Sequence, residues 1–329
     1  MTSQSRIPRR GAWIAIVAAT VACAATVHAA ADHLLISEVL VKERPGVTSY
    51  GSEYVEITNA GAAAASLAQV YLTDAGNSLN ATTFYYNIVT GGGAGGGGSS
   101  GDFHARFPVG STLAPGASVV VALRGSTAFQ TSHGRLPDYE LFEDGIAPDA
   151  VPELVEAFPG SIGFGLGNGS TNTVPTSGWL DDVSETLVMY QWDGATDLVA
   201  DLDYLTWGTS TSLRINKTGV TVDGPDADSV ASAYLADTAA GSQQAITTIH
   251  VYGDSFQRFS TDEGTEAATG GNGLTGHDET SENLTATWNV AADQDPTSTG
   301  TASPATPLVT AAETSPATPY DTLPVTVTA

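Results

Sequence analysis

Three carboxylates lie close together in one short turn of the chain. Asp223, Asp226 and Asp228 fall within the sequence DGPDAD, where a glycine and a proline mark a turn. Carboxylate oxygens that converge from a turn are the ligands that Ca²⁺ prefers, although the twelve-residue order of an EF-hand loop is absent. Calcium is therefore the one cofactor that the sequence suggests. The alternative is an ordinary solvated turn of an acidic protein.

His277 is the histidine with the most acidic surroundings. Asp278, Glu279 and Glu282 follow it closely along the chain. These groups could hold a cation together with the imidazole or raise its basicity, and a solvated polar loop is the other interpretation. The remaining histidines after the first thirty residues have no metal-pair spacing with one another; they are His33, His104, His133 and His250.

Motifs that would identify a catalytic site are missing. The glycine-rich segment 163–169, GFGLGNG, lacks the order of a dinucleotide-binding loop and the lysine of a P-loop, so it indicates a glycine loop. Neither an H-E-x-x-H helix nor a C-x-x-C pair occurs. Two carboxylates acting as acid and base, as in glycosidases, stay open as an alternative among 36 acidic residues. We therefore assign no catalytic residue.

The first thirty residues are typical of an export signal. Three arginines precede an apolar run over residues 12–27, which is short for a membrane span and is followed by small residues. We expect cleavage between Ala29 and Ala30, which would remove residues 1–29 and leave a secreted or cell-surface protein without a membrane span. Cys23 is the single cysteine and lies inside this signal. The mature protein therefore has no disulfide and no thiolate metal site.

The chain is strongly acidic. Among 329 residues, 11 Lys and Arg stand against 36 Asp and Glu, which gives a formal charge of -25. Proteins that bind nucleic acids or anionic membrane surfaces gain affinity from Lys and Arg. Nucleic acid is therefore not expected as a direct partner. An unknown protein or a cell-surface polymer is the partner class that remains.

Short apolar runs bounded by turn residues dominate the rest of the chain. Val55 and Ile57 alternate with polar neighbours, so both are expected to face the core. Helix is expected only in short pieces, such as residues 152–158 or 228–235. Short strands joined by Gly and Pro turns predict an all-β antiparallel sandwich. The expected strands are residues 34–41, 54–57, 113–123, 186–192, 197–206 and 246–252.

Composition divides the mature chain into a sandwich over residues 32–265, a polar extension over 266–292 and a Thr/Pro-rich tail over 293–329. The tail has too few apolar residues to order itself, so it is expected to be disordered. Two long loop insertions are expected inside the sandwich. Residues 91–101, GGGAGGGGSSG, indicate a flexible loop, and residues 125–178 contain few strand signals.

Several segments occur in an order that resembles a known family. They are SEYVEITNAG at 52–61, FPVGSTLAPGASVVVAL at 107–123, the hairpin at 186–208 and the closing SFQR at 255–258. Together they resemble the lamin-tail domain, an immunoglobulin-like sandwich found at the end of nuclear lamins and in many exported bacterial proteins. The resemblance implies an immunoglobulin-like β-sandwich of lamin-tail type.

Lamin-tail domains are binding and scaffolding modules without known catalytic residues. The resemblance therefore implies an exported, non-catalytic binding or scaffolding module whose ligand is unknown. One alternative is a calcium-assisted extracellular hydrolase, with its carboxylates in residues 125–178 and in later loops. Another is a purely structural component of the cell surface or matrix.

Overall fold

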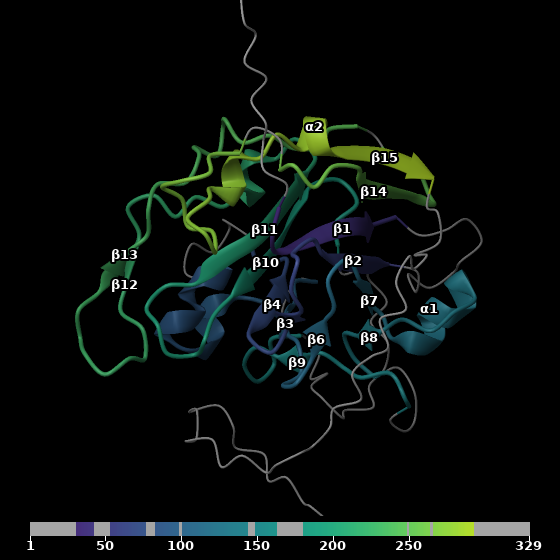
Figure 1. Cartoon of the computed structure of the whole chain (residues 1–329), viewed down its shortest axis with the longest axis horizontal. Helices are drawn as coiled ribbons and strands as arrows, with labels where there is room; N and C mark the ends of the chain where they lie inside the picture. The colour runs from purple at the N-terminus through teal and green to yellow at the C-terminus, as the bar shows by residue number, and fades with distance from the viewer. Residues whose placement is uncertain are drawn as a thin grey trace, which may run out of the picture.

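A computed structural model describes residues 31–42, 53–76, 83–98, 101–143, 149–162, 180–248, 250–263 and 266–292 of the chain. The expected cleavage site at Ala29 and Ala30, the glycine segment 163–169 and the tail 293–329 lie outside these residues. The described residues form two main β-sheets that share one hydrophobic core (Figure 1). The prediction of an all-β antiparallel sandwich is confirmed.

The larger sheet has the strand order β15-β14-β1-β2-β7-β8. Its neighbours pair antiparallel except β7 and β8, which are parallel. Its strands are β1 (Leu34–Leu40), β2 (Tyr54–Asn59), β7 (Ser118–Ala122), β8 (Tyr139–Glu140), β14 (Asp254–Arg258) and β15 (Trp288–Ala292).

The smaller sheet has the order β11-β10-β4-β5-β9 and is antiparallel throughout. Its strands are β4 (Val70–Thr73), β5 (His104–Arg106), β9 (Val155–Glu156), β10 (Glu185–Gln191) and β11 (Ala200–Trp207). Two short pairs form separate two-stranded sheets: β3 (Ala65–Ser66) with β6 (Thr112–Leu113), and β12 (Thr221–Val222) with β13 (Ser232–Ala233).

Helical segments in the described residues are short. The α-helices are α1 (Ser126–His133) and α2 (Leu284–Thr287). The 3₁₀ helices are η2 (Tyr85–Thr90), η3 (Gly92–Gly95), η4 (Thr211–Leu213) and η5 (Glu279–Ser281). None of the helices in these described ranges is both long and apolar enough to cross a membrane.

The alternation in β2 places its apolar residues as predicted. Val55 and Ile57 are fully buried in the main core, whereas Glu56 between them is only partly buried. Val55 pairs with Val39 on one side and with Val121 on the other. Apolar residues on one face of three adjacent strands thus pack against the second sheet, which is how a sandwich buries its core.

Three local predictions were wrong. Residues 246–252 form no strand: Ile246 makes an isolated bridge to Trp207, and Tyr252 is 61% exposed. The two helices expected over residues 152–158 and 228–235 are replaced by the short strands β9 and β13. Pairing with neighbouring strands determines the secondary structure of these segments, because local propensity over so few residues is weak.

The two expected insertions are more ordered than a flexible loop. Residues 92–95 form η3, and the backbone of Gly97 and Gly98 lies against residues 160 and 161 with no room for a side chain. Glycine is used here for close backbone approach rather than for flexibility. The described part of residues 125–178 supplies α1 and one edge strand to each sheet, β8 and β9.

The segment predicted as a polar extension, residues 266–292, contributes a strand to the larger sheet. Residues 288–292 form β15, which pairs with all five residues of β14 at the edge of the larger sheet. Trp288 is 4% exposed, and the Arg258 guanidinium lies over its ring at 4.7 Å from the centroid. The segment 266–292 is therefore part of the sandwich and crosses over its top edge in Figure 1. The polar composition of this segment gave no indication that Trp288 is buried in the core.

Candidate metal centre

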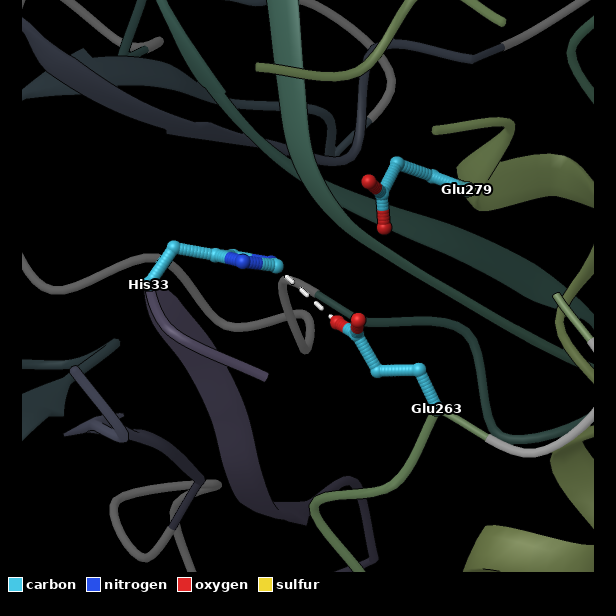
Figure 2. Close-up of side chains that lie close together, drawn as sticks. All are labelled: His33, Glu263 and Glu279. Atoms are coloured by element: carbon cyan, nitrogen blue, oxygen red, sulfur yellow. Dashed lines mark ion pairs between the residues drawn. The ribbon is translucent and has the colours of Figure 1, made fainter. Parts of the chain in front are cut away.

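Three side chains from distant parts of the chain meet beside the ends of β1 and β14. His33 precedes β1, Glu263 follows β14 and Glu279 begins η5. Figure 2 shows their side chains directed toward one another. One ligand atom from each lies within 4.8 Å of the others, and the three residues are only 8%, 5% and 5% exposed. This spacing and donor set suit a metal ion.

The imidazole of His33 has acidic neighbours on both sides: its Nδ1 lies 3.7 Å from Asp32 Oδ1, and its Nε2 faces Glu263. Its Nε2 lies 3.0 Å from the Leu202 carbonyl oxygen in β11 and 3.1 Å from Glu263 Oε1. Its buried Nδ1 has no hydrogen-bond partner. Burial alone would lower the pKa of His33, but the hydrogen bond and charge of Glu263 outweigh burial and raise it. The nitrogen that could ligate an ion beside Glu263 is therefore Nε2, and an ion there would replace its present contacts.

Glu263 holds an unusual backbone conformation. Among the described residues it is the only non-glycine residue with a positive φ, at 48°. An L-residue adopts this left-handed region at a cost, and such residues gather at functional sites. The conformation turns the chain sharply after β14 and directs the carboxylate back toward His33.

Glu279 is positioned by the cap of η5. Asp278 accepts a hydrogen bond from the backbone N–H of Thr280 at 3.2 Å, which fixes the start of this 3₁₀ turn. Burial, together with the nearby carboxylates of Glu266 and Glu263, raises the pKa of Glu279 well above its usual range. Burial and these neighbouring carboxylates thus favour the protonated form of Glu279 when no cation is bound.

A second group of possible ligands shares Glu263 with the first. Glu266 and His277 complete it, again with one ligand atom from each residue within 4.8 Å. His277 Nδ1 lies 3.6 Å from Glu266 Oε1 and 3.8 Å from Glu263 Oε2, and neither His277 Nδ1 nor Glu266 Oε1 has a hydrogen-bond partner. Burial and the charges of Glu263 and Glu282 raise the pKa of Glu266 to about 9. The two groups together form a site with one shared carboxylate.

Arg258 balances only part of this negative charge. Its guanidinium binds Asp203 at 2.8 Å and Glu282 at 2.8 Å, and the chain has no Lys or Arg after it. Glu263, Glu266 and Glu279 lie beside this pair of contacts, with only the two imidazoles as further bases in the group. Buried carboxylates are costly unless they are paired, protonated or bound to a metal ion. A divalent cation would neutralise ionised carboxylates here and also satisfy His277 Nδ1 and Glu266 Oε1.

The donor set selects the class of ion. Imidazole nitrogen with carboxylate oxygen, and no thiolate, is typical of zinc and of other divalent transition metals. Ca²⁺ takes oxygen ligands, so the two histidines disfavour it. The described residues thus offer a centre for one transition-metal ion on His33, Glu263 and Glu279, and for a second on Glu263, Glu266 and His277.

The calcium turn predicted from DGPDAD is only partly assembled. Asp223 and Asp226 group with Asp197, whereas Asp228 does not belong to the group. Asp228 Oδ1 instead accepts the Val230 N–H at 2.7 Å. Both Asp197 oxygens are already used, by the Gly224 N–H and by the Ser232 hydroxyl. The structure thus brings two of the three predicted calcium ligands together with Asp197, whereas the Asp228 side chain closes its own turn.

The three acidic residues that follow His277 in the sequence have different roles in the structure. Glu279 joins the first group of ligands, Asp278 caps η5, and Glu282 binds Arg258. His33, Glu263 and Glu266 were missed by sequence reasoning. The sequence around His33 gives no indication that this residue lies beside Glu263. About 230 residues separate the two, and they come together only because β1 pairs with β14.

The described part of residues 125–178 also brings three carboxylates together. Glu140, Glu143 and Asp149 offer ligand atoms within 4.8 Å of one another. Glu140 accepts the Ser126 N–H at 2.5 Å, Asp149 accepts the Ser126 hydroxyl at 2.6 Å, and Glu143 accepts the Asp149 N–H at 3.0 Å. Hydrogen bonds that fix the start of α1 thus explain this acidic group.

No family model matches the chain, and no curated protein matches it. A DUF4876 family protein from Bacteroides thetaiotaomicron VPI-5482, known from a crystal structure, is similar to the chain with a TM-score of 0.42. The two are 14% identical, and the similarity covers 81% of this chain and 72% of that chain.

Proposed function

We propose that the protein is an exported, non-catalytic binding or scaffolding module of lamin-tail type whose sandwich is closed by a buried metal centre. The observation that carries the metal centre is the group His33, Glu263 and Glu279, with unpartnered ring nitrogen and carboxylate atoms beside it. The predicted export signal and the order of sequence segments that resembles lamin-tail domains support the remainder of the proposal.

Burial makes this centre structural rather than catalytic. Structural metal sites are closed by protein ligands, whereas catalytic sites keep a position open for water or substrate. His33, Glu263 and Glu279 are each less than one tenth exposed, and only the His277 side chain, at 27%, reaches the surface. The ion would join the start of β1 to the chain after β14 and to η5. A single centre would then tie together two adjacent strands of the larger sheet and the segment that contains η5.

Binding would occur elsewhere on the surface. The acidic charge favours a partner that is neutral or basic, such as a protein or an uncharged cell-surface polymer. The rival function is a metal-assisted extracellular hydrolase.

Parallel assays on the metal-loaded full chain separate these functions. We expect retention on cell-envelope protein or on immobilised polysaccharide, without turnover in a panel of esterase, phosphatase and glycosidase substrates. The Glu279→Gln variant supplies the control for turnover, because it removes one ligand with little change in shape. Turnover by the wild type that is lost in this variant, while the variant stays folded, would establish the hydrolase instead.

A further inference from the structure

A lysine that does not belong to the metal centre is completely buried between two aspartates. Lys217 is 0% exposed, and its Nζ lies 2.5 Å from Asp201 Oδ2 and 3.4 Å from Asp237 Oδ2. Lysine is almost never fully buried, because its ammonium loses its hydration. The placement therefore calls for an explanation beyond stability, since a buried ion pair gives little net stabilisation.

The environment of Lys217 is aromatic. Its Nζ lies over the rings of Tyr85 and Tyr234, at 5.5 and 5.9 Å from their centroids. Tyr86 and Tyr190 belong to the same buried cluster. Such a core has a low local dielectric and excludes water, so reactions between its polar groups meet no competition from hydrolysis.

Each reacting group is held in place. Asp201 lies on β11, and its Oδ1 accepts the Tyr85 hydroxyl at 2.7 Å. The same hydroxyl lies 3.0 Å from Lys217 Nζ. Asp237 Oδ2 accepts the backbone N–H of Lys217 at 2.6 Å, and its Oδ1 accepts the Asn272 side chain. The amine, the carboxyl group and a second carboxylate are therefore fixed relative to one another.

We propose that Lys217 and Asp201 condense to form an intramolecular isopeptide bond. The bond from Lys217 Nζ to Asp201 Cγ forms, and the bond from Cγ to Oδ2 breaks. Of the three ammonium protons, one stays on the amide nitrogen and two leave on Oδ2 as water. Asp237 takes a proton from Nζ and passes it to Oδ2, while the Tyr85 hydroxyl stabilises the negative charge that develops on Oδ1. No oxidant or cofactor is required.

Burial reduces the cost of forming the neutral pair that reacts. Burial raises the pKa of Asp201, which favours its protonated and electrophilic form. Burial by itself lowers the pKa of Lys217, although the two carboxylates outweigh it and keep the ammonium in the resting pair. Transfer of one proton from Lys217 to Asp201 changes no net charge and removes two separated charges from a medium of low dielectric. Because Lys217 and Asp201 are already held close together in a fixed orientation, their reaction is intramolecular and needs no bimolecular encounter.

The isopeptide bond would provide a covalent cross-link within a chain that cannot form an internal disulfide. The chain has one cysteine, so no disulfide forms within it. A link between β11 and the loop after η4 would close the segment from Asp201 to Lys217, which also carries η4. Such a closure restricts the unfolded chain in the way a disulfide does.

Mass spectrometry of the purified full chain tests the bond directly. We expect an intact mass lower than that of the unlinked chain by one water molecule. Trypsin cuts after Arg214 and Lys217, so an unlinked chain releases the peptide Ile215-Asn216-Lys217. In the linked chain Lys217 is acylated, and peptide 215–258 stays attached to peptide 136–214. Release of the tripeptide at full yield, with no loss of water, would overturn the proposal.

Variants identify the atoms involved. Asp201→Asn should lose ammonia in place of water and give the same linked peptides, whereas Asp237→Asn should leave the chain unlinked. Lys42→Arg is the matched control, because Lys42 pairs with Asp182 at 3.6 Å on the partly exposed surface and should not affect the link. A succinimide at another aspartate also loses water but leaves Lys217 open to trypsin, so the tripeptide distinguishes the two. If a variant does not fold, the wild-type digest decides alone.

Discussion

We expect a chelator to lower the melting temperature of the purified protein by about 10 °C relative to the Zn²⁺-saturated form. An ion present at a thousandfold excess over its dissociation constant stabilises the folded state by about 4 kcal/mol. Each kcal/mol shifts the melting temperature of a domain of this size by about 2–4 °C. The ion would bind the carboxylates of Glu263, Glu266 and Glu279, which have no Lys or Arg partner of their own in the two ligand groups, and would displace the protons that burial favours on Glu266 and Glu279. Calorimetric melting with Zn²⁺ and with excess chelator measures the effect.

A matched pair of variants assigns this shift to the metal centre. Glu279→Gln removes one ligand and should make the melting temperature independent of the chelator. Asp226→Asn alters the exposed group with Asp197 and Asp223 and should keep the full shift. If the melting temperatures with Zn²⁺ and with chelator coincide in the wild type, the centre does not stabilise the fold.

Replacement of Val55 by Asp should unfold most of the protein at room temperature or lower its stability by about 5 kcal/mol. Val55 is fully buried, and it lies between Val39 and Val121 in the centre of the larger sheet. A carboxylate at this position has no basic partner on the neighbouring strands at these paired positions. Chemical denaturation, followed by tryptophan fluorescence, gives the free energy of unfolding.

The same substitution at an exposed valine is the control. Val109 is 73% exposed, so Val109→Asp should change the free energy of unfolding by less than about 0.5 kcal/mol. Glu56→Gln should also be mild, although Glu56 accepts the Ser37 hydroxyl at 2.7 Å. Equal denaturation midpoints for Val55→Asp and Val109→Asp would mean that the register of β2 is wrong.

Much of the sandwich could be predicted because its signals are local. The alternation in residues 54–57 determines which face of β2 is buried, and the turn at Asp193 and Gly194 marks the connection between β10 and β11. Gly194 has a φ of 81°, which is the reason a glycine is favoured there. Such features depend on residues close in sequence, so one sequence contains enough information.

The local predictions that differ from the structure have a common cause. The segments concerned pair with residues that are distant in sequence. Residues 288–292 form a strand only because β14 offers a free edge, and Ile246 makes a single bridge because Trp207 ends β11. The candidate site follows the same rule. The acidic turn at Asp223 was visible in the sequence, but the group that includes His33 and Glu263 depends on the way the two sheets close.

The most direct test of the metal centre is the metal content of the full chain after it has been loaded with Zn²⁺ and freed of unbound ions by gel filtration. We expect at least one Zn²⁺ per wild-type chain by elemental mass spectrometry, and an unchanged content in Asp226→Asn. Glu263→Gln removes the carboxylate common to both groups of ligands, so its content should fall to that of the buffer. A wild-type chain without bound zinc, or a Glu263→Gln variant that binds as much as the wild type, would contradict a metal centre at His33, Glu263 and Glu279.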